Sequence, residues 1–246
     1  MDKVLMITGG SRGIGKKIVE DFARCGYKVS FSYLSGKDNA ENLVKTLNSE
    51  GLEVVCKRVD ISNDEDIKSF VDFTLKEFGH IDVLINSAAI TNDSLFQDKS
   101  SSTFEKVVRT NLIGTFSISK IVGDIMYKSK KGKIINISST NGINTYFPMC
   151  LEYDATKAAI NSLTHNLAMQ FAPYVHVNAI APGFIATESE IKDMDEEFIK
   201  SEEEKILLRR AGTEEDVSNL AMFLASEKSD YINNQIIKIN GGVYGD

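Results

Sequence analysis

The 246-residue sequence contains no tryptophan and only three cysteines and three histidines. The cysteines are odd in number, widely spaced and without a C-x-x-C motif, which indicates free thiols rather than a disulfide framework. They are Cys25, Cys56 and Cys150. The histidines lack the short spacing of metal ligands, so the sequence predicts no metal site. They are His80, His165 and His176.

Long apolar runs and excess positive charge are also missing. No stretch of 18 apolar residues occurs, and the opening residues MDK lead into an apolar strand rather than a signal peptide, so we expect a cytoplasmic protein without a membrane span. The net charge of −7 argues against binding to nucleic acid or anionic membranes. With 42% hydrophobic residues and no low-complexity linker, residues 1–246 are expected to form a single domain.

Short β-branched runs alternate with longer segments of helical periodicity. The seven predicted strands are 3–8, 28–33, 53–59, 81–86, 133–138, 175–181 and 235–240. The predicted helices are 13–25, 38–50, 63–78, 103–128, 152–171 and 214–226. This order predicts an α/β, Rossmann-type doubly wound sheet of about seven parallel strands with helices on both faces. The charge-rich segment 187–205 interrupts the alternation and is interpreted as a substrate lid or as a solvated acidic helix.

A glycine-rich turn, TGGSRGIG at 8–15, follows the first strand and precedes a helix. Gly9, Gly13 and Gly15 allow a tight turn and the close approach of a pyrophosphate to the positive end of the helix. This position in a doubly wound sheet favours a dinucleotide site over a plain connecting turn.

The end of the second strand indicates which dinucleotide binds. NAD-binding versions of the fold carry an acid there, whereas this sequence has Ser32, Tyr33, Leu34 and Ser35. With Arg12 in the turn and Lys37 beyond the strand, the sequence favours NADPH over NADH, unless both cations are ordinary surface charges.

Tyr153 and Lys157 lie four residues apart within LEYDATKAA and would share one helix face. A lysine ammonium beside a tyrosine favours the phenolate and so makes the hydroxyl a better proton donor. The pair alone is also compatible with a solvated surface contact.

Six motifs in order resemble the short-chain dehydrogenase/reductase superfamily. They are TGGSRGIG at 8–15, NSAAI at 86–90, TNLIGTF around Asn111, INISSTNG at 135–142, YDATK at 153–157 and NAIAPGFIAT at 178–187. The stretch AITNDSLFQDKSSSTFEKVVRTNLIGTF is most similar to the 3-oxoacyl-[acyl-carrier-protein] reductases. Such enzymes use NADPH to form (3R)-3-hydroxyacyl carrier proteins in fatty-acid-type biosynthesis.

The resemblance implies a catalytic tetrad. Tyr153 would protonate the carbonyl oxygen, with Lys157 lowering its pKa and holding the nicotinamide ribose. Asn111 would hold a water that links the lysine to solvent. A serine would polarise the same oxygen. Ser139 is the second serine of the motif, but Ser138 has the usual spacing to the tyrosine; we choose Ser139 because loop length varies more easily than a strand-end motif.

The resemblance also implies a set of cofactor contacts. The turn would contribute Gly9, Ser11, Arg12, Gly13, Ile14 and Gly15, and the second strand Tyr33 and Ser35. Asp60 would contact the adenine, Asn86 and Ala88 would line the cofactor, and Tyr153 and Lys157 would reach its ribose. Pro182, Gly183, Ile185 and Thr187 would close over the nicotinamide.

Partners are implied less directly. Lys128, Lys130 and Lys131 would dock an acyl carrier protein, or they form a solvated helix end. The resemblance also implies a homotetramer formed through helices 103–128 and 153–171. The apolar segment 145–152 would line a substrate pocket or a subunit interface.

Two other functions remain open from the sequence. One is an alcohol, sugar or steroid dehydrogenase on the same scaffold. The other is a non-catalytic dinucleotide-binding regulator, because Ser87 and Ala89 replace an asparagine and a glycine usual in the family.

Overall fold

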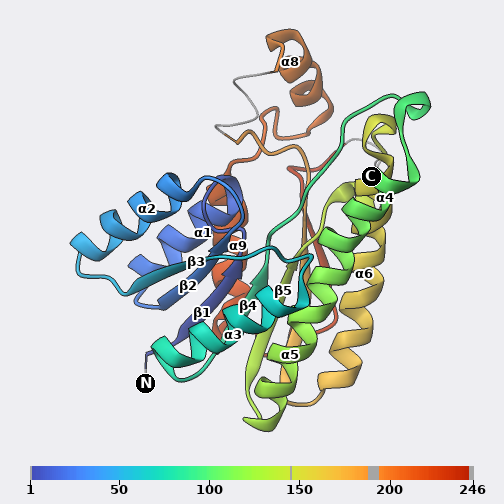
Figure 1. Ribbon diagram of the computed structural model, residues 1–246. Coiled ribbons are helices and arrows are strands. Elements are labelled where there is room, and N and C mark those ends of the chain that lie inside the picture. The colour runs from blue at the N-terminus through green and yellow to red at the C-terminus, as the bar shows by residue number, and fades with distance from the viewer. Residues whose placement is uncertain (1, 145, 188–193, 244–246) are drawn as a thin grey trace.

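The computed structural model describes residues 2–144, 146–187 and 194–243. Seven parallel strands form one sheet in the order β3-β2-β1-β4-β5-β6-β7 (Figure 1). Their bounds are β1 Val4–Thr8, β2 Lys28–Tyr33, β3 Val54–Arg58, β4 Val83–Asn86, β5 Gly132–Ile137, β6 Val175–Pro182 and β7 Ile236–Ile239. The predicted parallel, doubly wound sheet is confirmed, because β1 has β2 on one side and β4 on the other.

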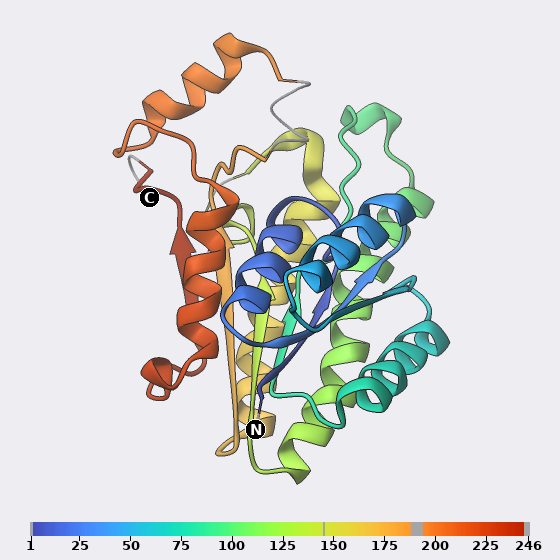
Figure 2. The same cartoon turned by 90° about the vertical axis from the view of Figure 1, so that its left-hand side faces the viewer.

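Helices cover both faces of the sheet. Their bounds are α1 Gly13–Arg24, α2 Lys37–Ser49, α3 Asp64–Phe78, α4 Ser101–Val108, α5 Thr115–Lys128, α6 Leu151–Phe171, α8 Glu196–Lys205 and α9 Glu214–Ala225. One core layer joins α1, α2 and α9 to the sheet, and the other joins α3, α5 and α6. Figure 2 shows these layers from the side, with α8 standing apart from both.

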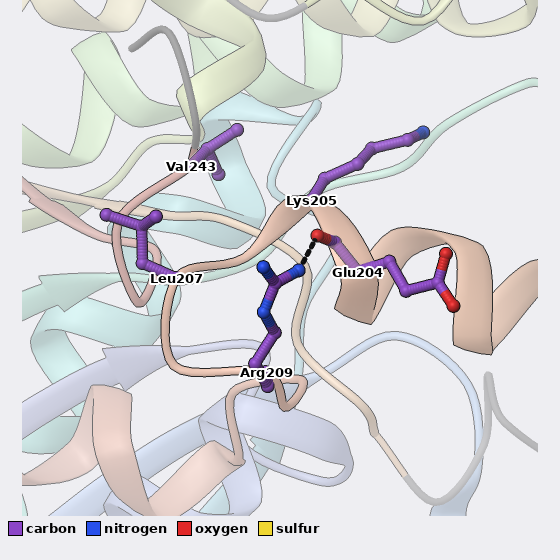
Figure 3. A pocket seen from close by; sticks show the side chains of 5 residues that line it. All are labelled: Glu204, Lys205, Leu207, Arg209 and Val243. Carbon is purple, nitrogen blue, oxygen red and sulfur yellow. Dashed lines mark hydrogen bonds between the residues drawn. The ribbon is translucent and has the colours of Figure 1, made fainter.

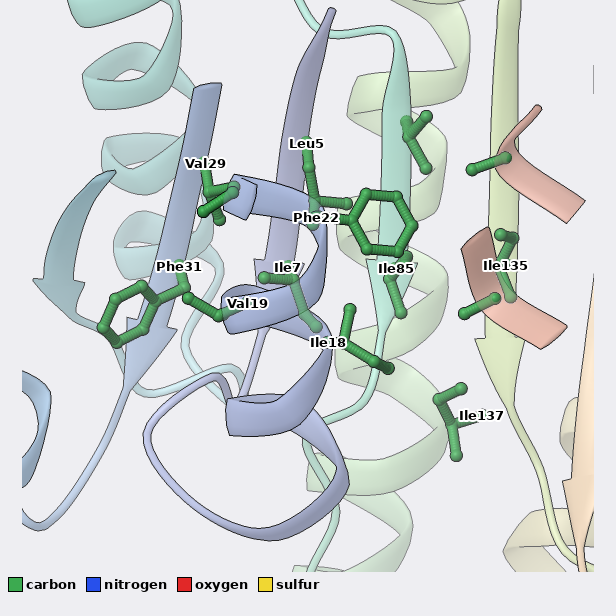
Figure 4. Packing of buried hydrophobic residues seen from close by; sticks show 14 of the residues in the cluster. Leu5, Ile7, Ile18, Val19, Phe22, Val29, Phe31, Ile85, Ile135 and Ile137 are labelled. Carbon is green, nitrogen blue, oxygen red and sulfur yellow. The ribbon is translucent and has the colours of Figure 1, made fainter. Parts of the chain in front are cut away.

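Strand alternation separates the two core layers. Leu5 and Ile7 of β1 belong to the same core layer as Phe22 of α1, whereas Met6, between them, belongs to the opposite layer (Figure 4). Successive side chains of a strand point to opposite faces, so a parallel sheet covered on both sides needs apolar residues at every position. The continuous apolar runs of the sequence therefore form this sheet.

The segment predicted as one helix over 103–128 is more complex. A π-helical turn, Arg109–Gly114, interrupts it and separates α4 from α5. Gly114 is required there, because a β-carbon would stand 2.3 Å from the Ile61 carbonyl oxygen. Such π turns inside helices are frequent at functional sites.

The interrupting segment predicted over 187–205 is partly described. Residues 188–193 lie outside the described residues, and α8 follows them. The rings of Phe184 and Phe198 pack edge to face at 6.3 Å, and Ile206 forms an antiparallel bridge with Val243. The first contact joins the start of α8 to the residues after β6, and the second joins the end of α8 to the C-terminal segment. A lid function stays a prediction.

Candidate active site

The glycine-rich turn brings the end of β1, the start of α1 and the loop after β4 into close contact. Gly9 has a φ of +72°, and a β-carbon on it would stand 2.9 Å from the Ala88 Cα. A β-carbon on Gly15 would stand 2.1 Å from the Gly9 carbonyl oxygen. The turn therefore tolerates only glycine at both positions, as the sequence predicts.

The start of α1 is suited to bind an anion. No side chain caps this helix and no acid lies in its first turn, whereas α3 begins with three acids and an Asn63 cap. The nearest atom to a β-carbon built on Gly13 would be Thr187 Cγ2, at 3.8 Å. The backbone N–H groups of the first turn and the helix dipole at this position fit a pyrophosphate.

The end of β2 holds the glycine-rich turn through two hydrogen bonds. The Ser32 hydroxyl and carbonyl accept hydrogen bonds from the amides of Gly9 and Gly10, at 3.3 and 2.9 Å. Tyr33 is only 8% exposed and packs in the core, whereas Ser35 is exposed. Ser35 is therefore accessible to a ligand, whereas the Tyr33 side chain is not, and the strand end carries no acid.

Arg12 and Lys37 differ in their availability. Arg12 is exposed and forms no ion pair with any described residue. Lys37 pairs with Glu41 at 3.5 Å, one helical turn ahead. Arg12 is therefore better placed than Lys37 to bind a phosphate group of a ligand, such as the one that distinguishes NADPH from NADH.

The ends of β3 and β4 carry two further predicted cofactor residues. Asp60 accepts hydrogen bonds from the amide and hydroxyl of Ser62, which hold the pKa of its carboxyl below the usual 3.8. Asn86 is buried, and its amide donates to Ser119 and Asn136 at 2.8 Å each. Its side chain thus stabilises the interior, so a cofactor would meet only its backbone.

The loop after β4 is fixed by Thr8. The Thr8 hydroxyl accepts hydrogen bonds from the amides of Ser87 and Ala88, both at 3.1 Å. This threonine was not among the predicted site residues, although its place at the end of the first strand is a usable sequence indication. It keeps Ala88 against Gly9.

Tyr153 and Lys157 lie in the first two turns of α6. The Lys157 Nζ stands 5.2 Å from the centroid of the Tyr153 ring. Lys157 is 4% exposed, and its Nζ donates to the Ile137 carbonyl at the end of β5, at 2.6 Å. Burial lowers the pKa of this lysine from 10.5 to about 8. The pair is therefore not a solvated surface contact.

The two candidate serines have different surroundings. Ser138 is buried, and its hydroxyl donates to Asn161 Oδ1 at 2.6 Å. Ser139 is half-buried and accepts a hydrogen bond from the Asn141 amide at 3.2 Å, which leaves its own proton available. This geometry favours Ser139 as the residue that meets a substrate.

Asn111 lies in the π-helical turn and holds the loop after β4. Its Oδ1 accepts from the Ile90 amide at 2.8 Å, and its Nδ2 donates to the Ile90 carbonyl at 2.9 Å and to Thr156 at 3.2 Å. The side chain thus connects the loop to α6 beside Lys157. The predicted water link to Lys157 stays a prediction.

The chain that leaves β6 is held by the residues around β7 and by Gly212. The Gly183 amide donates to the Ile239 carbonyl at 3.0 Å, and Ile185 forms a bridge with Gly212. A β-carbon on Gly183 would stand 2.6 Å from Asn240 Cβ, so β7 fixes this exit. Within this segment Thr187 lies near the glycine turn, since its Cγ2 would stand 3.8 Å from a β-carbon built on Gly13. The predicted closure of residues 182–187 over the nicotinamide stays a prediction.

None of the predicted catalytic residues lines either of two pockets found in the described part of the chain. One, of about 360 Å³, lies between the end of α8 and the C-terminal segment (Figure 3). The other, of about 350 Å³, is lined by Asn141, Gly142, Ile143, Tyr146, Phe147, Pro148, Leu151, Asp154, Ala155 and Ala158. The described part of the apolar segment 145–152 thus lines a pocket, although on a different face of α6 from Tyr153; residue 145 lies outside the described residues.

The lysine cluster is far from this site. Lys131 pairs with Asp82 at 2.9 Å, and the Lys130 ammonium stands 5.7 Å from the Tyr174 ring centroid. These residues precede or begin β5, at the amino ends of the strands, whereas Tyr153 lies at the carboxyl ends. No group of three metal-ligating side chains occurs among the described residues, and none of their helices is long and apolar enough to cross a bilayer.

The glycine turn, the uncapped helix and the buried lysine beside a tyrosine together define a class of protein, the nicotinamide-dependent oxidoreductases with a Rossmann-type fold. The family model described as enoyl-(acyl carrier protein) reductase matches residues 9–244. The chain belongs to the short-chain dehydrogenase/reductase superfamily and is an NAD(P)-dependent short-chain oxidoreductase.

Curated relatives match over nearly the whole chain. A 3-oxoacyl-[acyl-carrier-protein] reductase of Staphylococcus epidermidis is 36% identical over 99% of this chain and 100% of its own length. The enzyme of the same description from Thermotoga maritima is 36% identical, over 98% of this chain and 97% of its own. The predicted resemblance to this group is confirmed.

Solved structures agree with this placement. A 3-oxoacyl-[acyl-carrier protein] reductase from Brucella melitensis superimposes with a TM-score of 0.91 at 30% identity, covering 99% of this chain and 92% of its own. ElxO with NADP bound gives 0.89 at 31% identity, covering 98% of both chains. The cofactor of this fold is a nicotinamide dinucleotide.

Proposed function

We propose that this protein is an NADPH-dependent reductase of 3-oxoacyl thioesters carried on acyl carrier protein. The observation that carries the proposal is the buried Lys157 ammonium beside the Tyr153 ring, at the sheet edge that also holds the glycine turn. Relatives of that description, similar over their whole length, support the substrate class.

The residues have separate roles in this reaction. The glycine turn and Lys157 would hold a nicotinamide cofactor, which when bound in its reduced form would supply a hydride to the carbonyl carbon. The Tyr153 hydroxyl gives its proton to the carbonyl oxygen as the carbon–oxygen π bond breaks, so the ketone becomes a secondary alcohol. Lys157 stabilises the phenolate that remains, and the Ser139 hydroxyl donates a hydrogen bond to the same oxygen.

The experiment that tests this function follows NADPH oxidation at 340 nm. Acetoacetyl thioesters of coenzyme A and of acyl carrier protein would be supplied in parallel, each with NADPH and with NADH. We expect turnover of both thioesters with NADPH, faster for the carrier-linked form. Cofactor binding without turnover of either thioester would contradict the proposal and move the substrate to alcohols, sugars or steroids.

Replacing the two neighbouring serines separates their roles. We expect Ser139→Ala to lower kcat about 100-fold, because a hydrogen bond to the developing oxyanion is lost, with little change in stability. Ser138→Ala should retain most activity but unfold about 1–3 kcal/mol more easily, because Asn161 loses its buried partner. Thioester turnover and urea denaturation of both variants measure this; the reversed pattern would assign the role to Ser138.

Arg12 is the proposed contact for the 2′-phosphate of NADPH. We expect Arg12→Ala to raise the KM for NADPH about tenfold and to leave the KM for NADH unchanged, because only NADPH carries the phosphate. Lys37→Ala is the matched control, since Lys37 already pairs with Glu41. Equal losses with both cofactors would show that Arg12 acts on a part that they share.

We also propose that the protein forms a homotetramer and that it contacts acyl carrier protein. Exposed apolar side chains on the helices around α5 and α6 support a homotetramer; they are Phe104, Phe116, Tyr127 and Met169. Docking of the carrier at Lys128, Lys130 and Lys131 is less well supported, because they lie at the sheet edge opposite Tyr153.

A further inference from the structure

A buried ion pair joins the loop after β4 to the catalytic helix. Lys99 ends the loop 91–99, and its Nζ stands 2.6 Å from Glu152 Oε2 in the first turn of α6. Their side chains are 9% and 1% exposed. The pair is therefore unlike the exposed ion pairs of this protein, such as Lys28–Glu53. Because both side chains are shielded from water, removing one charge would leave the other buried without a partner.

The Lys99 ammonium holds more than the carboxylate. It donates to the carbonyls of Asn92 and Met149, both at 2.9 Å, so it contacts the loop 91–99 and the segment before α6 at once. The Ser94 amide adds a hydrogen bond to the Met149 carbonyl at 3.2 Å. We call Lys99 and Glu152, with these contacts, the Lys99–Glu152 clamp.

Other contacts fasten the same loop. Asn111 holds Ile90 immediately before it. The Cys150 thiol donates to Asp93 Oδ1 at 2.9 Å, and the Thr91 hydroxyl donates to the same oxygen at 2.7 Å. The loop is thus attached to the π-helical turn at its start and, further along, to the 3-10 turn Pro148–Cys150 and to the first turn of α6.

This attachment bears directly on Tyr153, which follows Glu152 in the sequence. The preceding segment is a short 3-10 turn, Pro148–Cys150, with no side-chain cap on the helix that follows. Besides the hydrogen bonds that Asp154 accepts from the Asn141 amide group and the Phe147 backbone amide, at 2.8 and 2.9 Å, contacts with the loop 91–99 therefore hold the start of α6. A shift of about 1 Å in a reacting group can cost about 100-fold in rate.

We propose that Lys99 and Glu152 are positioning residues that hold the first turn of α6, and hence the Tyr153 hydroxyl, at the place where it meets the substrate carbonyl. Neither side chain contacts the substrate. The inference rests on the proposed function only in taking Tyr153 as the acid. A buried ion pair suits this task, because it is satisfied in one relative placement of loop and helix, whereas apolar contacts tolerate several.

The test compares Glu152→Gln, Lys99→Met and the double variant with the wild type. We expect each single change to lower kcat for acetoacetyl thioesters at least about tenfold, with the Kd for NADPH within about twofold. Hydrogen exchange should become faster over 91–99 and 150–156. The double variant should lose no more than the worse single variant, because no unpaired charge remains.

Two controls make the result specific. Glu53→Gln breaks the exposed Lys28–Glu53 pair, at 2.9 Å, and should leave kcat and exchange unchanged. Glu152→Asp keeps the charge and should retain more activity and more exchange protection than Glu152→Gln. If Glu152→Gln does not fold, the Glu152→Asp and double variants still report the coupling.

Several results would overturn the proposal. They are an unchanged kcat in both single variants, losses that simply add in the double variant, or a parallel loss of NADPH binding that shows general disruption. If the wild type turns over no thioester, the proposed function fails, but hydrogen exchange still tests the clamp: unaltered exchange at 150–156 would overturn it.

Discussion

Tyr153→Phe is expected to lower kcat by about 10²–10⁴-fold while NADPH binds as tightly as to the wild type. The hydroxyl is the proton donor in the proposed reaction, and general acids contribute a factor of this size. The phenyl ring fills the same space, so the contact of the Lys157 ammonium with the ring face, 5.2 Å from its centroid, persists.

The measurement is single-turnover oxidation of NADPH with the acetoacetyl thioesters, beside a fluorescence titration of NADPH. The titration is the control, because it shows that the cofactor site is intact. Turnover within tenfold of the wild type would exclude Tyr153 as the acid.

Lys157→Met is expected to weaken NADPH binding and to remove most turnover together. The ammonium is the proposed partner of both the nicotinamide ribose and the Tyr153 phenolate, and methionine keeps the length of the side chain without its charge. Parallel titrations and initial rates measure both effects. Loss of turnover alone, with tight NADPH binding, would show that Lys157 acts on Tyr153 but not on the ribose.

The same variant has an effect on stability that depends on pH. The folded pKa of Lys157 is about 8 and the ordinary value is 10.5, so the lysine is charged in both states below pH 8 and burial then opposes folding. Between these values only the unfolded state binds the proton. The wild type should therefore gain about 3 kcal/mol relative to Lys157→Met as the pH rises through this window.

Urea denaturation of both proteins at several pH values from 7 to 10.5 measures this difference. Other titrating groups are common to both proteins, so their contributions cancel to first order. A difference that stays constant across the window would show that Lys157 is not buried as a charged group.

Much of the fold follows from local pattern. The strand predicted over 28–33 coincides with β2, and the helix predicted over 152–171 begins one residue earlier, at Leu151. Apolar periodicity is a property of neighbouring residues, and an α/β sheet repeats it in each unit. The interruption of α4 and α5 escaped prediction, because the close approach of Gly114 to Ile61 is a tertiary contact.

The site residues also divide into those that follow from local pattern and those that depend on tertiary contacts. Gly9 and Gly15 could be predicted because a tight turn imposes its own backbone requirements. The predicted place of Asn86 beside the cofactor stays a prediction, and the inward direction of its side chain depends on Ser119 and Asn136, which lie on other elements. The preference for Ser139 over Ser138 likewise depends on a tertiary contact, because the Ser138 hydroxyl is bonded to Asn161 of α6.

The sequence by itself determined the parallel sheet, the dinucleotide turn and the pairing of Tyr153 with Lys157, because each depends on spacing within one short segment. Only the tertiary structure decided the burial that lowers the pKa of Lys157, and the joining of Lys99 to Glu152 across 52 intervening positions. Desolvation and buried charge pairing arise only when distant segments exclude water together, and no local pattern records them.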